Sequence, residues 1–228
     1  IGEAMGGLRY VSGDPTTQPS RMGISIGDEL AAMHACMGAL MAIHARERTG
    51  KGQVVDSAIY ESVLNMMESL VTEHHVAGYT RERTGPIIPN VAPSNIFETS
   101  DQQMILIAAN QDGVFSRLCK VMDRPELSSD ERYSTHSARG KNQQELDDLI
   151  NDWTKTKSLK EVESLCNENG IPAGLIYKAK DMIEDPHFKE REAIIDIEHP
   201  EFGLIKMQNV APKLSRNPGE VRQVGPKL

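Results

Sequence analysis

Cysteine is scarce in this chain, with only three copies among 228 residues. Cys36, Cys119 and Cys166 are odd in number, far apart in sequence, and form no Cys-x-x-Cys pair. This spacing argues against a disulfide framework and against a cysteine zinc site, so we expect three buried thiols. Clusters of His, Asp, Glu and Cys with the spacing of metal ligands are also lacking, and we therefore expect no metal.

Positive charge is in short supply too, since 25 Lys and Arg residues stand against 33 Asp and Glu residues. The resulting formal charge of −8 argues against a nucleic-acid partner, which requires a basic face. No uninterrupted apolar run approaches the roughly 18–20 residues of a membrane span, and Ile1 does not begin a signal segment. We therefore expect a soluble cytoplasmic protein with no membrane partner.

The stretch from Gly27 to Gly52 is the most informative part of the sequence. Its apolar residues cover more than one stripe of a helix, which predicts a core helix buried on most sides. Asp28 lies at the start of this helix, where free backbone N–H groups and the helix dipole stabilise a negative charge by roughly 0.3–1 kcal/mol. Most aspartates in this position are N-caps, and that structural interpretation stays open.

Four motifs follow one another along the chain in a recognisable order. Gly27-Asp28 and its helix lead into Arg48-Thr49-Gly50-Lys51-Gly52, and further motifs occupy Asn169–Gly174, Glu184–His187 and Val210–Ser215. This ordered set resembles the class III CoA-transferase family, which includes formyl-CoA transferase and carnitine CoA-transferase. The resemblance covers nearly the whole chain. It implies that Asp28 is the catalytic nucleophile and that this chain is a fragment lacking a long N-terminal segment.

An enzyme of this family moves CoA from an acyl-CoA to a free carboxylic acid. By resemblance, the Asp28 carboxylate forms a mixed anhydride with the acyl group, and CoA then converts this anhydride into an aspartyl-CoA thioester. A carboxylate with a reference pKa of about 3.9 is already ionised at neutral pH, so no general base is needed. The Gly27 N–H is a candidate donor to the oxyanion. Coenzyme A enters as a substrate, with no permanently bound cofactor, and its binding residues are expected mainly in the missing segment.

The expected fold is α/β. The resemblance implies an open α/β large domain, partial here, a small α/β domain, and an interlocked ring-shaped homodimer. We assign residues 1–60 to the large CoA-binding domain, 61–94 to a linker helix and loop, 95–186 to the small domain, and 187–228 to a hairpin and an extended segment that returns to the large domain.

Periodicity and turn signals predict the individual elements. A loop is expected over residues 1–26, and strands over 53–59, 104–109 and 171–177. Helices are expected over 60–78, 113–122, 143–154 and 179–184, and a hairpin over 194–198 and 204–208. Ser128 and Ser158 each begin a Ser-x-x-Glu capping box, which predicts a helix start at both serines.

A loop of residues 87–93 occupies the place where the family often carries a glycine-rich lid, but it contains no glycine. Apolar residues around Met66, Met67 and Leu70 would lose their covering surface in the fragment. We therefore expect the 228 residues alone to self-associate.

Two alternatives remain. The α-methylacyl-CoA racemase branch also carries Gly-Asp here and uses the aspartate as an acid and base, but it usually continues with a glycine run that residues 29–32 lack. The second alternative is that these 228 residues form a non-catalytic structural module, because the segment that holds the nucleotide of CoA would be missing.

Overall fold

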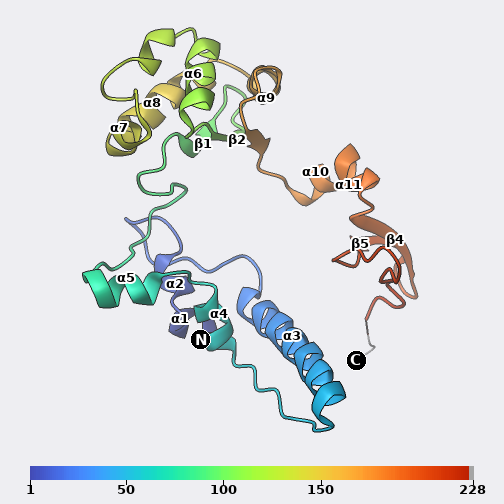
Figure 1. Cartoon of the computed structure of the whole chain (residues 1–228). Coiled ribbons are helices and arrows are strands. Elements are labelled where there is room, and N and C mark those ends of the chain that lie inside the picture. The colour runs from blue at the N-terminus through green and yellow to red at the C-terminus, as the bar shows by residue number, and fades with distance from the viewer. Residues whose placement is uncertain (226–228) are drawn as a thin grey trace. The chain divides into compact units, whose positions relative to one another are not determined.

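The computed structural model describes residues 1–225, which divide into a first unit, residues 1–174, and a second unit that begins at Leu175 (Figure 1). The N-terminal part of the first unit is helical. Its elements are α1 (Gly2–Met5), α2 (Leu8–Val11), α3 (Ile26–Thr49), α4 (Ile59–Asn65) and α5 (Leu70–Ala77). The predicted domain boundaries refer to the complete family architecture and stay predictions.

Helix α3 confirms the predicted helix and ends as expected, because Gly50 adopts a left-handed φ of 71° as its C-cap. The predicted loop over 1–26 is wrong in part, since it contains α1 and α2. The predicted helix over 60–78 is broken into α4 and α5, and Glu68 between them has a positive φ of 54°. An uninterrupted helix cannot accommodate that backbone conformation.

The strand predicted over residues 53–59 is not formed. The segment is extended, but it runs along α3 without pairing with a strand. Ser57 donates a hydrogen bond of 3.0 Å to the Ala31 carbonyl, and Val55 packs so closely on Gly38 that a Cβ on that glycine would lie 2.7 Å from Val55 Cγ1. The alternating pattern therefore reports an extended backbone that packs on a helix.

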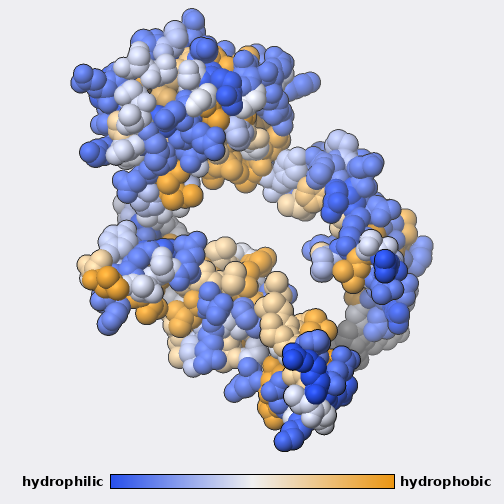
Figure 2. All heavy atoms as spheres, in the orientation of Figure 1, coloured by the Kyte–Doolittle hydropathy of each residue, from blue (hydrophilic) through white to orange (hydrophobic). Residues whose placement is uncertain are grey.

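The prediction that α3 is buried on most sides is wrong for the described chain, in which Gly27 is its one buried residue. Met33, Leu40 and Met41 are 61%, 62% and 68% exposed, and Figure 2 shows hydrophobic residues open to solvent in this helical part. The helix is also long and apolar enough to count as a candidate membrane span, contrary to the sequence expectation. The core helix of a soluble protein meets the same criteria.

The rest of the first unit is a small α/β layer. Strands β1 (Ser94–Glu98), β2 (Met104–Ala108) and β3 (Ala173–Leu175) form a sheet in the order β1-β2-β3, and β1 pairs antiparallel with β2. The helices of this layer are α6 (Asp112–Val121), a 3-10 turn (Pro125–Ser128), α7 (His136–Lys141), α8 (Gln143–Thr154) and α9 (Leu159–Glu168). The predicted strands at 104–109 and 171–177 are thus confirmed, the second in shortened form.

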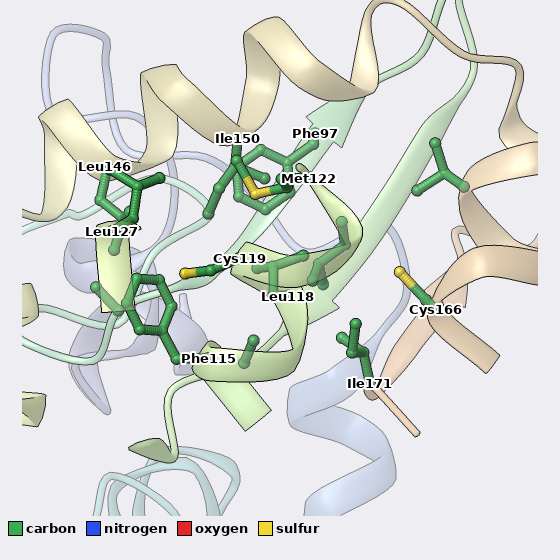
Figure 3. Packing of buried hydrophobic residues seen from close by; sticks show 14 of the residues in the cluster. Phe97, Phe115, Leu118, Cys119, Met122, Leu127, Leu146, Ile150, Cys166 and Ile171 are labelled. Carbon is green, nitrogen blue, oxygen red and sulfur yellow. The ribbon is translucent and has the colours of Figure 1, made fainter. Parts of the chain in front are cut away.

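One face of this sheet carries the hydrophobic core. Figure 3 shows side chains from β1, α6, α8 and α9 packed together, among them Phe97, Phe115, Leu118, Cys119, Leu146, Ile150 and Cys166. Ile105 and Ile107 of β2 point into the core, whereas Met104 and Leu106 on the other face are 48% and 40% exposed. The continuous apolar run of β2 therefore predicted the strand but not its one-sided burial.

Capping and cysteine predictions have mixed outcomes. The Ser158 capping box is confirmed, with both reciprocal hydrogen bonds to Glu161, but Ser128 ends the 3-10 turn and begins no helix. Cys119 and Cys166 are buried, and burial raises the pKa of each thiol to about 11. Cys36 is exposed, so the expectation of a third buried thiol is wrong.

The second unit contains α10 (Ala179–Glu184), α11 (Pro186–Glu190), β4 (Ile194–His199) and β5 (Gly203–Gln208). The predicted helix and hairpin are confirmed. Ile195 pairs with Met207 and Ile197 with Ile205 across the hairpin. Pro186 begins α11, because its fixed φ suits the first turn of a helix.

Candidate active site

Asp28 is the third residue of α3, and its backbone takes no capping role. The N-cap is Ser25, whose carbonyl accepts hydrogen bonds from the backbone N–H groups of Asp28 (3.0 Å) and Glu29 (3.1 Å). The interpretation of Asp28 as an N-cap is therefore wrong. Its side chain is exposed, and no residue between 1 and 225 forms a hydrogen bond or ion pair with the carboxylate. The carboxylate is open to solvent.

Two free backbone donors share the first turn of α3 with Asp28. The N–H groups of Ile26 and Gly27, at the first two positions of α3, have no acceptor within the described residues. Unpaired donors at a helix start, reinforced by the helix dipole, stabilise negative charge. The Gly27 N–H is the predicted oxyanion donor, and the Ile26 N–H is a neighbouring amide of the same helix start.

Gly27 also allows close packing at the start of α3. It is buried, and a Cβ at this position would lie 3.1 Å from Ile59 Cγ2, 3.6 Å from Val63 Cγ2 and 3.9 Å from Glu3 Cγ. A larger residue would push the start of α3 away from α4 and α1. The glycine before the aspartate therefore lets the helix start pack closely against its neighbours.

Gly6 of the Gly6-Gly7 pair also packs on α4. A Cβ on Gly6 would lie 2.6 Å from Val63 and 2.8 Å from the Tyr60 carbonyl, and Gly7 has a left-handed φ of 93°. This turn folds α2 back beside α1. It brings Arg9 next to Glu3, where Arg9 Nε lies 3.4 Å from Glu3 Oε2. No local pattern predicts this ion pair, because residues six apart meet only through the turn.

The remaining candidates lie away from this arrangement. His34 of α3 uses its Nδ1 in a 2.8 Å hydrogen bond with the Leu30 carbonyl of the same helix. The described residues contain no group of three or more His, Cys, Asp and Glu side chains that could hold a metal ion. The loop of residues 87–93 is fixed to α8 by Gln143, which donates to the carbonyls of Ile88 and Val91.

A family assignment follows from comparison with known proteins. Residues 1–228, the whole chain, match the model of CoA-transferase family III. The chain belongs to this family. The resemblance inferred from its motifs is thereby confirmed.

Relatives of this family III chain include two enzymes of Chloroflexus aurantiacus. The chain is 54% identical over its full length to a succinyl-CoA–D-citramalate CoA-transferase, and it spans 57% of that protein. It is 33% identical to the beta subunit of a succinyl-CoA–L-malate CoA-transferase, again over its full length and 57% of the relative. The family III chain thus spans little more than half of these curated relatives.

A solved structure supports the fold. A CAIB/BAIF family protein from Brucella suis matches all of this family III chain with a TM-score of 0.85 at 28% identity, and the match covers 59% of that protein. The expected α/β fold is confirmed. The interlocked homodimer stays a prediction.

Proposed function

We propose that the full-length protein is an acyl-CoA:carboxylate CoA-transferase and that Asp28 is its nucleophile. The observation that carries the proposal is an unpaired Asp28 carboxylate in the same helical turn as the free N–H groups of Ile26 and Gly27, in a chain of family III. The named relatives act with succinyl-CoA on citramalate, malate, mesaconate and glutarate. We therefore infer succinyl-CoA as the donor and another small dicarboxylic acid as the acceptor.

The proposed reaction begins when an Asp28 oxygen attacks the thioester carbonyl. The carbon–sulfur bond breaks, CoA leaves as its thiolate, and a mixed anhydride remains on Asp28. The thiolate then attacks the aspartyl carbonyl, which releases the donor acid as a carboxylate and leaves an aspartyl-CoA thioester. Each intermediate stays about as reactive as a thioester, which keeps the transfer reversible.

The acceptor carboxylate repeats these steps in reverse. It attacks the aspartyl thioester, CoA leaves again, and the thiolate attacks the acceptor carbonyl of the new anhydride. The products are the acceptor acyl-CoA and a regenerated Asp28 carboxylate. No proton transfer is required at the nucleophile. Each tetrahedral oxyanion needs hydrogen-bond donors, and the N–H groups of Ile26 and Gly27 are the donors we assign.

The first test traps the intermediate. The full-length protein is incubated with succinyl-CoA and then with hydroxylamine or borohydride. Peptide mass spectrometry should find a mark on Asp28, namely the side chain covalently changed by either reagent. We expect Asp28→Ala to abolish the mark and to lower the transfer rate by about a thousandfold or more. Glu29→Gln is the matched control: it removes the neighbouring acidic side chain, and we expect it to keep both the mark and the rate.

The alternatives give different results in the same experiment. A racemase-like enzyme would exchange the proton α to the thioester carbonyl without any mark on Asp28. A non-catalytic module is the alternative for the isolated 228 residues, and calorimetry with CoA tests it, because a module of this kind shows no binding.

Assembly and location belong to the same proposal. We infer a cytoplasmic homodimer, with α3 as a core helix and without a membrane or nucleic-acid partner. One relative is named as a beta subunit, so an assembly of two different chains is the alternative. Native mass spectrometry of the purified full-length protein distinguishes the two.

A further inference from the structure

The pair formed by Glu3 and Arg9 lies directly beside the start of α3. Figure 1 shows α1, α2 and α4 grouped near the N-terminal end of this helix. Glu3 Cγ lies 3.9 Å from the position of a Cβ on Gly27, the residue before Asp28. The Glu3 side chain is only 11% exposed, so its carboxylate sits in a poorly hydrated place.

A buried carboxylate requires a charge partner, and Arg9 is the one that the described residues provide. The atoms that face each other, Glu3 Oε2 and Arg9 Nε, are both shielded from solvent, and neither makes a hydrogen bond of good geometry. The 3.4 Å ion pair therefore holds the guanidinium by its inner nitrogen. The contact with Glu3 anchors Arg9 through Nε and leaves the other guanidinium nitrogens available for a ligand.

The two outer nitrogens of Arg9 have no partner among residues 1–225. Arg81 is different, because its guanidinium nitrogens bind Glu68, Ser69 and Glu73. The Arg9 side chain is 36% exposed, so the outer nitrogens can meet a ligand. Two parallel N–H donors of a guanidinium match the two oxygens of a carboxylate.

We propose that Arg9 binds the second carboxylate of the dicarboxylic substrate, the one that does not react with Asp28. This inference rests on the proposed function and adds a residue that determines the substrate class. The distances are compatible: the steps from Asp28 through Gly27 and Glu3 place Arg9 Nε at most about 15 Å from the Asp28 Cα. The Asp28 side chain, a four-carbon acyl group and the outer part of the guanidinium together span a comparable length.

The experiment compares two donors on the full-length protein. Succinyl-CoA and butyryl-CoA have four-carbon acyl groups of similar shape, and only the succinyl group carries a second carboxylate. The measured quantity is the ratio of their kcat/KM values for acyl transfer to Asp28. We expect Arg9→Gln to lower the succinyl value by about 50–100-fold and to change the butyryl value by less than about twofold.

Two further variants complete the test. Arg48→Gln removes the same charge from α3, twenty residues and roughly 30 Å beyond Asp28, and we expect it to leave the ratio unchanged. The double variant Glu3→Gln/Arg9→Gln leaves no buried charge without a partner, so the fold is kept. We expect its ratio of kcat/KM for succinyl-CoA to that for butyryl-CoA to fall as far as it does in Arg9→Gln.

The possible failures are distinguishable. Equal losses for both donors, or an unchanged ratio in the double variant, overturn the role of Arg9 while leaving the transferase intact. If the wild-type protein forms no acyl-Asp28 from either donor, the proposed function itself is wrong.

Discussion

At the scale of single residues, Asp147 is unusual because it carries an ionisable side chain and is only 5% exposed. Its Oδ2 accepts a hydrogen bond of 2.9 Å from Asn95 Nδ2, and its Oδ1 has no partner within the described residues. Burial raises the pKa of Asp147 to about 6; the Asn95 hydrogen bond acts in the opposite direction, and the neighbouring Asp148 adds to the rise. Keeping this carboxylate ionised therefore costs folding free energy.

The raised pKa of Asp147 decides how the free energy of unfolding changes with pH. Because the pKa of Asp147 is higher in the folded protein than the ordinary value of 3.8, the folded state holds more protons between these values. Stability should fall as the pH rises through this window and stay lower above it. We expect Asp147→Asn to stabilise the protein by about 1–2 kcal/mol near pH 8 and to have no effect near pH 4, measured by urea unfolding.

Asp152→Asn is the control, since Asp152 is exposed on the same helix. Its effect on unfolding should not depend on pH in this window. A pH-independent effect of Asp147→Asn would contradict the assignment of the raised pKa to Asp147.

At the scale of elements, α8 covers the edge of the small sheet with a polar stripe. Gln143, Asp147, Asn151 and Thr154 recur every three or four residues, so they share one face of the helix. Asn151 accepts from the Glu98 N–H at 3.2 Å, and Thr154 donates to the Glu98 carbonyl at 2.7 Å. Strand β1 is an edge strand, and these bonds satisfy backbone groups that another chain could otherwise pair with.

Residues of α7 and α8 also hold the loop of residues 87–93 in place. Gln143 accepts from the Asn90 N–H at 3.2 Å, and the buried Arg139 of α7 donates to the Ala92 carbonyl at 3.1 Å. Gly140 allows the close approach, because a Cβ there would lie 2.6 Å from the Asn90 carbonyl oxygen. The loop thus has a defined conformation although it contains no glycine.

A pair of glycine substitutions tests this packing. We expect Gly140→Ala to destabilise the protein by about 1–3 kcal/mol, because the new methyl group meets backbone that cannot move without breaking the Gln143 bonds. Gly113→Ala in α6 is the matched control. Its Cβ would have Arg117 Nη1 at 4.0 Å as its nearest neighbour, and alanine favours helix by up to about 1 kcal/mol. Thermal unfolding should therefore shift in opposite directions; shifts in the same direction would contradict this account.

At the scale of the whole molecule, the exposed apolar face of α3 is the main surface without a packing partner among the described residues. Large apolar side chains on this helix are open to solvent, namely Met33, Met37, Leu40, Met41 and Ile43. Large apolar side chains that stay exposed together on one helix mark a surface that another protein or a membrane contacts. We propose that a second copy of the chain covers this face of α3.

Self-association of the isolated 228 residues tests this proposal. We expect light scattering to find oligomers or aggregates, and Leu40→Lys/Met41→Lys to reduce their mass, because both side chains are more than 60% exposed. Glu47→Lys on the same helix should not reduce it. A monodisperse wild-type monomer would argue against the covered-face interpretation. The related prediction of self-association rests on exposure of Met66, Met67 and Leu70; Met66 is exposed, Leu70 is half-buried, and the premise is wrong for Met67, which is buried.

Much of the fold was predictable because its signals are local. Ser158 and Glu161 form a capping box, Gly50 ends α3, and the apolar spacing gave α6 and α8 almost to the residue. The helix position of Asp28 followed from the same reasoning, and its proposed role from an ordered set of motifs. Such features depend on residues a few positions apart, and a linear sequence shows them directly.

The tertiary structure decided everything that depends on which surfaces meet. Residues 53–59 alternate like a strand but lie along α3, and the apolar run of that helix predicted burial that the described chain does not supply. Glu3 reaches both Arg9 and Gly27 only because the Gly6-Gly7 turn packs against α4. Periodicity reports the backbone conformation and the faces of an element, whereas burial, ion pairs and free donors depend on the neighbours that folding provides.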